Sequence, residues 1–322
     1  MSIKRALDRA KICVEHFQQT HFCTEKFTLT RLMGKTNAVH DHHVFLMQSN
    51  ARKLVLKLCF TAREKHGLGE EFRNLQKVFG DLGNQGRCRV PEPIAYCDEP
   101  RYFVSEFIEG ETVFDLLHRA KTVAQRDDLF AKLGEFTAAL HLSTYVETRP
   151  FWPKFYMSKL TERWEEAKKM DLWRDHDVDG YINQLRKQMK HVRGRDVIKV
   201  SSHGDLHARN VMIGANAIWG IDFAGAGHMM NVIDVTGLMI ASDCKTPPLG
   251  GALSDLGLVK SHQDAFFNAY APAGSLTEVM AFSMRANLLR TWIGYSDQDY
   301  ATTKKRKSFA LVGARVKHAF GD

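Results

Sequence analysis

The chain has 322 residues, a length above that of most single domains, which predicts two lobes or two domains. Its 44% hydrophobic and 25% charged residues are ordinary for a globular protein and exclude a disordered or fibrous chain. The net charge of +8 suits contacts with anionic molecules. The same balance is common in proteins that bind no nucleic acid, and we expect no nucleic-acid partner.

The cysteines and the apolar runs bear on the cellular compartment. Six cysteines are scattered without a Cys-x-x-Cys pair, which argues against a zinc site and against a disulfide framework. No apolar run is long enough to span a bilayer, and charged residues follow the N-terminus where a signal peptide would have its apolar core. We therefore expect a cytoplasmic protein with reduced thiols and no membrane span.

The first elements are a helix and a pair of strands. Apolar residues at helical spacing predict an amphipathic helix over 2–19. Alternation from Phe27 and an extended run from Val39 to Met47 predict two strands, with a turn at Gly34 to Asn37. A glycine turn between strands can present backbone N–H groups to phosphates. Hairpin turns also carry glycine for conformational reasons alone, so both interpretations stay open.

The next strand, over 52–60, is apolar on both faces except for Lys57. Burying an ammonium group without a partner is costly, so a buried Lys57 requires anionic partners. Phosphate groups and a helix carboxylate could be these partners. The alternative is a lysine at a strand edge whose ammonium group reaches water. Period-two alternation places Val55 on the same face as Lys57.

A helix and two further strands follow before the composition becomes helical. The helix over 70–79 begins with Glu70 and Glu71 and carries an apolar face. Strands are predicted at 90–96 and 102–110, the second ending at Gly110. The remaining helices are predicted at 128–142, within 154–193, from 233 onward, and at 264–270, 276–295 and 304–320.

The stretch from Ser201 to Phe223 concentrates polar residues in a strand-loop-strand unit. Asp205 and Asn210 share a six-residue loop, and a short apolar strand then ends at Asp222. A small piece of chain can thus bring several oxygen ligands to one point. Phosphoryl transfer needs a carboxylate that orients the attacking hydroxyl, and oxygen ligands that hold Mg²⁺ against nucleotide phosphates. The loop supplies both.

The segment His203-Gly204-Asp205 with Asn210, followed by Ile221-Asp222-Phe223, resembles the catalytic loop and metal-binding strand of the aminoglycoside phosphotransferase family. That family, with choline kinase-like relatives, belongs to the protein kinase-like superfamily. The resemblance implies an α+β fold with two lobes. Residues 1–105 would form a small N-lobe with an antiparallel sheet and a helix, 106–110 a hinge, and 111–322 a larger, mostly helical C-lobe.

The resemblance also implies the chemistry. Asp205 would be the catalytic base, and Asn210 and Asp222 would be the Mg²⁺ ligands. The cofactors would be ATP and Mg²⁺, and the reaction would move the γ-phosphate of ATP to a hydroxyl of a small-molecule acceptor such as an aminoglycoside-, sugar- or choline-like compound.

The same resemblance assigns the nucleotide contacts. Lys57 would grip the α- and β-phosphates and would be held by Glu71, with Glu70 as the open alternative. The other nucleotide-binding positions implied by the resemblance are Gly34, Val55, Glu106, Phe107 and Ile108.

Two alternative functions remain at this point. The loop from Asp205 to Asn210 is close to that of tyrosine kinases, but Gly204 replaces the usual arginine and Asp222-Phe223 is followed by alanine. A protein kinase of the same superfamily is therefore the second hypothesis. A pseudokinase that binds nucleotide without transferring phosphate is the third, although all the key positions are filled.

Overall fold

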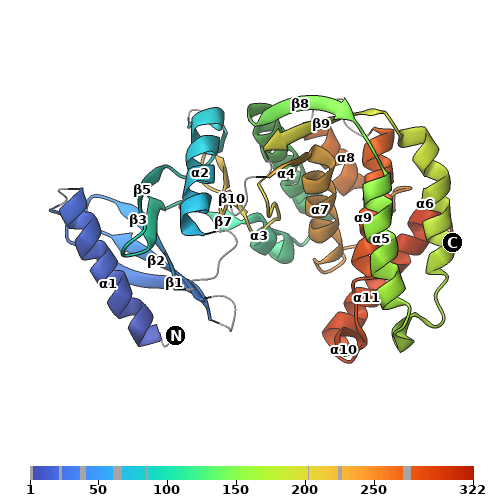
Figure 1. Ribbon diagram of the computed structural model, residues 1–322, viewed down its shortest axis with the longest axis horizontal. Helices are drawn as coiled ribbons and strands as arrows, with labels where there is room; N and C mark the ends of the chain where they lie inside the picture. Colours follow the sequence, from blue (N-terminus) through green and yellow to red (C-terminus); the bar gives the residue numbers. More distant parts are fainter. Residues whose placement is uncertain are drawn as a thin grey trace. The chain divides into compact units, whose positions relative to one another are not determined.

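The computed structural model describes residues 3–21, 24–36, 41–60, 67–84, 86–201, 203–223, 227–270 and 277–322. They form two compact units (Figure 1). The first contains the described residues within Met1–Gly110, His203–Asp205 and Met212–Gly227. The second contains those within Glu111–Ser202, Leu206–Val211 and His228–Asp322. The mixture of an antiparallel sheet and many helices confirms the predicted α+β class.

The first unit is built on an antiparallel sheet in the order β1-β2-β3-β6-β5. Two helices accompany it, and β4, β11 and β10 form a smaller sheet in which β4 and β11 run parallel. The elements are α1 (Ile3–Thr20), β1 (Thr28–Thr36), β2 (Asp41–Gln48), β3 (Lys53–Cys59), α2 (Leu68–Leu82), β4 (Cys88–Arg89), β5 (Pro93–Cys97), β6 (Tyr102–Glu106), β10 (Val211–Ile213) and β11 (Ile218–Gly220).

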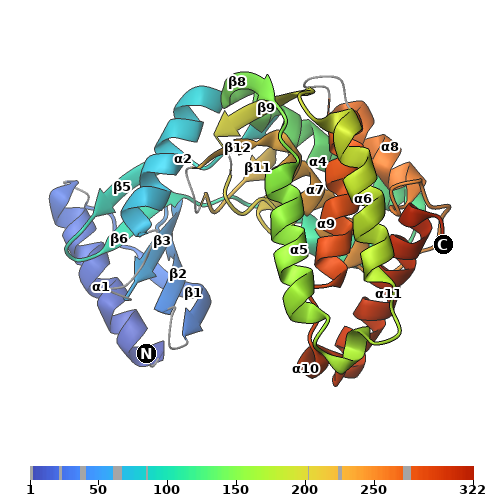
Figure 2. The same ribbon diagram turned by 45° about the vertical axis from the view of Figure 1, so that its right-hand side comes forward.

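The two faces of this sheet carry different helices. Along β3, Leu54, Leu56 and Leu58 are buried in one core with apolar residues of α1, which lies along the sheet in Figures 1 and 2. The residues between them point to the opposite face, because side chains alternate along a strand. There α2 packs on β5 and β6, with the ring of Phe72 5.7 Å from that of Tyr96. The strand therefore has one face in a dry core and one face under α2.

The second unit is mostly helical and includes an antiparallel sheet in the order β12-β9-β8. Its elements are β7 (Glu111–Thr112), α3 (Val113–Arg119), α4 (Val123–Ser143), β8 (Tyr145–Pro150), α5 (Lys154–Ala167), the 3-10 helix η1 (Asp171–Trp173), α6 (Val178–Val192), β9 (Asp196–Ser201), β12 (His228–Met230), α7 (Asn231–Cys244), α8 (Lys260–Ala269), α9 (Glu278–Trp292), α10 (Asp297–Tyr300) and α11 (Thr303–Phe320).

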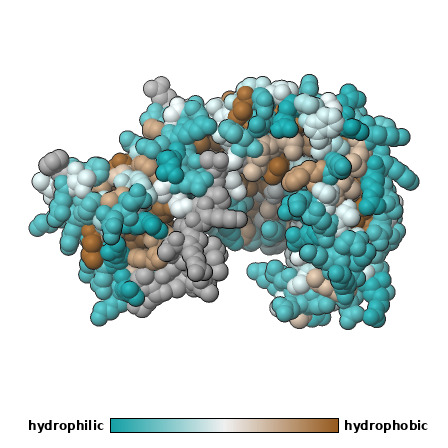
Figure 3. Space-filling model, viewed as in Figure 1, coloured by the Kyte–Doolittle hydropathy of each residue, from teal (hydrophilic) through white to brown (hydrophobic). Residues whose placement is uncertain are grey.

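None of the helices in the described part of the chain is both long and apolar enough for a bilayer span. The face drawn in Figure 3 is largely hydrophilic over α6 and α11.

A buried ionic network joins three helices of the second unit. The Asp243 carboxylate on α7 is 3% exposed and contacts His262 Nδ1 of α8 at 2.7 Å and Arg315 Nη1 of α11 at 3.2 Å. It also accepts a hydrogen bond from the Val259 amide. Removing one member of such a group leaves an uncompensated buried charge, which is the costly event in a protein interior.

We therefore predict that Asp243→Ala lowers the free energy of unfolding by about 3–5 kcal/mol, because Arg315 stays buried without its carboxylate. Urea unfolding of the variant and of the natural chain would measure the difference. The matched control is Asp264→Ala on α8, whose ion pair with Lys260 is exposed and should contribute less than about 1 kcal/mol. Equal losses in the two variants would contradict the prediction.

Candidate active site

Lys57 lies on the α2 face of β3. Its neighbour on β6 is Phe103, and the ammonium group lies 5.2 Å from the centre of that ring. The Lys57 side chain is 18% exposed, so most of its length is removed from water. The alternation of β3, with Leu56 and Leu58 in the core on the other face, puts Lys57 there.

Glu71 of α2 is the helix partner of Lys57. Phe72, the next residue, packs against Tyr96 and Phe103, with ring centres 5.7 Å and 5.9 Å apart, and this contact fixes the helix on the sheet. Glu71 Oε1 accepts a hydrogen bond from Lys57 Nζ in a close ion pair. Of the two glutamates that the sequence offered, Glu71 and not Glu70 pairs with Lys57.

Asp222 is the second carboxylate on Lys57. It follows β11, and its Oδ1 accepts a hydrogen bond from Lys57 Nζ. Its backbone φ of 68° lies in the left-handed region, and among the residues that the structure describes it is the only non-glycine residue with a positive φ. Such conformations cost free energy and concentrate at functional sites. Three segments that are distant in the sequence therefore meet at one ammonium group.

His203 holds the chain around Asp222. It is fully buried, and its Nε2 lies 2.9 Å from the carbonyl oxygen of Ile221. A carbonyl can only accept, so Nε2 carries the proton. The imidazole also packs on Phe223, with ring centres 4.3 Å apart. His203 thus contacts the residues on both sides of Asp222, a positioning role that the sequence motif did not reveal because it comes from a tertiary hydrogen bond.

Asp205 comes two residues after His203, in the same unit as Lys57, Glu71 and Asp222. The chain turns at Gly204, whose φ of 82° also lies in the left-handed region, and Asp205 is exposed. Leu206, the next residue, is 7% exposed, so its buried side chain anchors the loop. An anchored turn with an exposed carboxylate can present that group to an incoming molecule.

Asn210 ends the loop and belongs to the second unit. It is 5% exposed, and its backbone N–H donates a hydrogen bond to the backbone carbonyl of His207 at 2.8 Å. Earlier in the loop, the carbonyl of Ala208 accepts from the amide of Phe114, and the guanidinium carbon of Arg209 lies 3.4 Å from the centre of the Phe114 ring. These contacts attach the loop to α3.

Gly34 lies in a strand and not in a turn, which corrects the sequence-based prediction. β1 continues to Thr36, and Gly34 pairs with His43 of β2. Asn37, the last residue of the predicted turn, lies outside the described residues. A Cβ at Gly34 would collide with the Arg31 guanidinium and would come within 2.7 Å of His43 Nδ1. The pairing of β1 with β2 therefore extends the first strand to Thr36.

The remaining predicted nucleotide contacts lie around the end of β6. Val55 is half-buried and pairs with Ser105. The amide of Glu106 donates to the carbonyl of Glu92, and the amide of Phe107 donates to the carbonyl of Lys53. Both amides are thus engaged in the sheet. Ile108 is 7% exposed.

The pKa values of Lys57, Glu71 and Asp222 depend on one another. Burial alone would lower the pKa of Lys57, but the charges of Asp222 and Glu71 outweigh it, and the pKa lies above its ordinary value. The Lys57 charge holds the pKa of Asp222 well below its ordinary value of 3.8, against the effect of burial. Burial raises the pKa of Glu71 to about 7, although Lys57 opposes this. Lys57 and Asp222 are therefore both charged at neutral pH.

We predict that the stability difference between the natural chain and Asp222→Asn shrinks as the pH falls. A carboxylate with a depressed pKa in the folded state stabilises the fold above its ordinary pKa of 3.8 and loses this contribution below it. Asparagine also adopts the left-handed conformation, so any backbone effect is constant with pH. Urea unfolding of both proteins between about pH 6 and about pH 3 would measure the difference. A difference that does not change with pH would contradict the prediction.

The chain is similar in fold to several solved structures. In the solved structures, the chain is similar to the amicoumacin kinase hAmiN in complex with AMP-PNP, Ca²⁺ and Ami, at 15% identity over 99% of this chain and 96% of that one, with a TM-score of 0.56. It is similar to a choline/ethanolamine kinase family protein from Mesorhizobium loti at 14% identity over 94% and 95% of the two chains, with a TM-score of 0.55.

A third similar structure is the macrolide 2'-phosphotransferase MphH from Brachybacterium faecium, at 13% identity over 93% of this chain and 97% of that one, with a TM-score of 0.53. These likenesses confirm the predicted two-lobed kinase-like fold. A search of curated proteins finds no match. The family model described as "Phosphotransferase enzyme family" matches residues 37–258, more than half of the sequence. The chain therefore belongs to the phosphotransferase enzyme family.

Proposed function

We propose that this phosphotransferase moves the γ-phosphoryl group of ATP to a hydroxyl of a small-molecule acceptor. The observation that carries the proposal is the ammonium group of Lys57 between the carboxylates of Glu71 and Asp222. A lysine that is held by a helix glutamate and lies beside a metal-binding aspartate is the arrangement with which kinases grip nucleotide phosphates. The family assignment and the complex of the amicoumacin kinase with AMP-PNP support a nucleotide substrate.

Lys57 can hold a phosphate without losing its helix partner. An ammonium group has three N–H donors, and the carboxylates of Glu71 and Asp222 accept from it. The remaining donor serves a phosphate oxygen. Because the pKa of Lys57 is raised, the group stays charged throughout the neutral range.

The oxygen donors fit Mg²⁺. Asp222 has a side chain that is 45% exposed, and Asn210 offers an amide oxygen. Carboxylate and amide oxygens are hard ligands that suit Mg²⁺, which normally keeps substrate phosphates and water among its ligands. Within the described residues, no group of three His, Cys, Asp or Glu side chains could hold a metal ion. From the chemistry of these two oxygen donors, we assign Asn210 and Asp222 as ligands that share the ion with nucleotide phosphates, whose charge it would neutralise when bound.

Asp205 is the residue that we assign to the acceptor. Its exposed carboxylate would accept a hydrogen bond from the acceptor hydroxyl and would orient that oxygen toward the γ-phosphorus. As the new P–O bond forms, the bond to the ADP oxygen breaks and the hydroxyl proton passes to Asp205. His203 supports this step indirectly, because it fixes the backbone between the loop and Asp222.

We assign the adenine contact to the backbone at Ile108, since the amides of Glu106 and Phe107 are engaged in the sheet. Val55 would contact the adenine ring from the Lys57 face of β3, and the strand at Gly34 would cover the phosphates. The acceptor belongs to the small hydroxyl compounds that the similar proteins are named for, among them macrolides and choline or ethanolamine.

The proposal is tested by following labelled phosphate from γ-labelled ATP. The full chain is incubated with Mg²⁺ and a cell lysate, which is then separated into a protein and a metabolite fraction, and in parallel with an aminoglycoside, a macrolide, choline and a hexose. Label in a small molecule supports the proposal. Label in protein alone would favour a protein kinase, and a complete lack of transfer and of Mg²⁺-dependent ATP hydrolysis would favour a pseudokinase.

We predict that Asp205→Asn lowers kcat by about 10² or more, because the acceptor hydroxyl loses its base. The fold and ADP binding should stay intact, since the side chain is exposed. Phosphate transfer, calorimetric ADP binding and the melting temperature would be measured together. Asp264→Asn, at an exposed aspartate of α8, is the control variant. Near-normal turnover of Asp205→Asn would remove this residue from the mechanism.

We also predict that Glu71→Gln raises the KM for ATP about tenfold while Glu70→Gln changes it less than about twofold. Of these two glutamates only Glu71 contacts Lys57, so neutralising Glu71 leaves the ammonium less well oriented and neutralising Glu70 does not. The two residues are neighbours in the first turn of α2, which makes each variant the control for the other. Equal KM changes would contradict the assignment of Glu71.

A further inference from the structure

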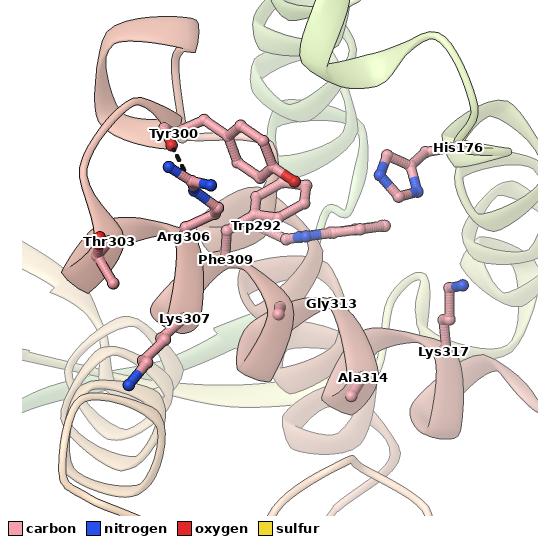
Figure 4. A pocket seen from close by; sticks show the side chains of 11 residues that line it. His176, Trp292, Tyr300, Thr303, Arg306, Lys307, Phe309, Gly313, Ala314 and Lys317 are labelled. Carbon is pink, nitrogen blue, oxygen red and sulfur yellow. Dashed lines mark hydrogen bonds between the residues drawn. The ribbon is translucent and has the colours of Figure 1, made fainter.

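A pocket of about 630 Å³ lies near the C-terminal end of the second unit (Figure 4). It is formed by His176, which precedes α6, by Trp292 at the end of α9, by Tyr300 at the end of α10, and by one face of α11. Its volume is in the range of sites for small molecules. None of its residues is among the predicted nucleotide or catalytic positions, so the pocket is separate from the proposed active-site residues.

Aromatic rings form the walls of this pocket. The ring of Trp292 lies 5.0 Å from His176 and 5.5 Å from Phe309, and Tyr300 lies 5.4 Å from Phe309. In Figure 4 the indole of Trp292 lies between His176 on one side and Tyr300 and Arg306 on the other. Trp292 and Phe309 are 1% and 5% exposed, whereas Tyr300 is 40% exposed, so Tyr300 is the ring on which another aromatic ring can stack.

The indole N–H of Trp292 is an unsatisfied donor. Trp292 is 1% exposed, and its Nε1 has no hydrogen-bond partner among the described residues. A buried donor without an acceptor destabilises the folded protein. Gly313 of α11 also lines the pocket, and a Cβ at this position would lie only 2.8 Å from that nitrogen. Glycine thus keeps the N–H edge of the indole clear of a side chain, and a ligand with an acceptor atom would satisfy it.

The charged residues of the lining are all cations, namely Arg306, Lys307 and Lys317. Arg306 is fixed in place, because its Nε donates to the carbonyl of Tyr300 at 3.2 Å and its guanidinium lies 5.6 Å from the Tyr300 ring. Lys317 extends toward His176 in Figure 4, whereas Lys307 points away from the rings. Burial and the Lys317 charge lower the pKa of His176, which is therefore neutral at pH 7.

We propose that this pocket binds a small aromatic anion, with its ring against Tyr300 and its acidic group between Arg306 and Lys317, where it accepts a hydrogen bond from Trp292. The site lies beyond the proposed phosphotransferase function and does not depend on it. A cation is disfavoured by the basic lining, and a neutral aromatic compound would leave the indole donor and the cations without an acceptor.

The first experiment uses the fluorescent probe 1-anilinonaphthalene-8-sulfonate with the full chain. We expect saturable binding at one site, and about tenfold weaker binding in the double variant Arg306→Gln with Lys317→Gln. The control, Lys187→Gln with Lys304→Gln, removes the same charge from exposed positions outside the pocket and should change affinity less than about twofold. N-phenyl-1-naphthylamine, which has the same rings without the sulfonate, should bind far more weakly. Equal losses in both double variants, or equal binding of the neutral compound, would overturn the proposal.

The second experiment locates the probe. Ala314 lines the pocket on the exposed side of α11, so Ala314→Phe should fill it and abolish binding at an unchanged melting temperature. In ¹⁵N-labelled protein, the indole N–H signal of Trp292 should move on saturation more than those of the other tryptophans. Competition by 1-naphthoate and by 1-naphthyl phosphate then separates carboxylate from phosphate ligands. Full binding by a folded Ala314→Phe variant, or an unmoved Trp292 signal, would contradict the assignment.

Discussion

The ammonium group of Lys57, held by Glu71 and Asp222, is the interaction on which the rest of the site depends. A half-buried lysine on a strand is tolerable only if its charge is compensated, and here two carboxylates from other segments compensate it. The same charges that make the lysine stable also keep it protonated and fixed in direction, as the proposed phosphate contact requires. Stability and the proposed function therefore depend on the same three charges.

Much of the cluster could be predicted because it follows from local rules. Alternation along β3 separates Lys57 from the leucines of the core, and an apolar helix face orients α2 so that Glu71 meets the lysine. The spacing of polar residues between Ser201 and Phe223 identified the family, which the family match confirms. The roles of Asp205 and Asn210 rest on that spacing and on the proposed chemistry, and they stay predictions.

The features that escaped prediction depend on contacts between distant segments. Gly34 was placed in a turn, but its pairing with His43 of β2 keeps it in β1. β8 was missed because all its residues are exposed and show no alternation of apolar and polar side chains. The hydrogen bond of His203 to Ile221 and the unsatisfied indole of Trp292 belong to tertiary packing, which no local pattern encodes.

The order of these segments along the chain has a consequence for biosynthesis. Asp222 is made 165 residues after Lys57. At ribosomal rates of about 5–20 residues per second, Asp222 is synthesised roughly 8–33 s after Lys57. The nascent N-terminal sheet therefore leaves the ribosome with a charge that only Glu71 compensates. The ion pair between Lys57 and Asp222 can form only after most of the polypeptide has been synthesised. A ribosome that stalls before Asp222 therefore yields a sheet in which Lys57 lacks this ion pair.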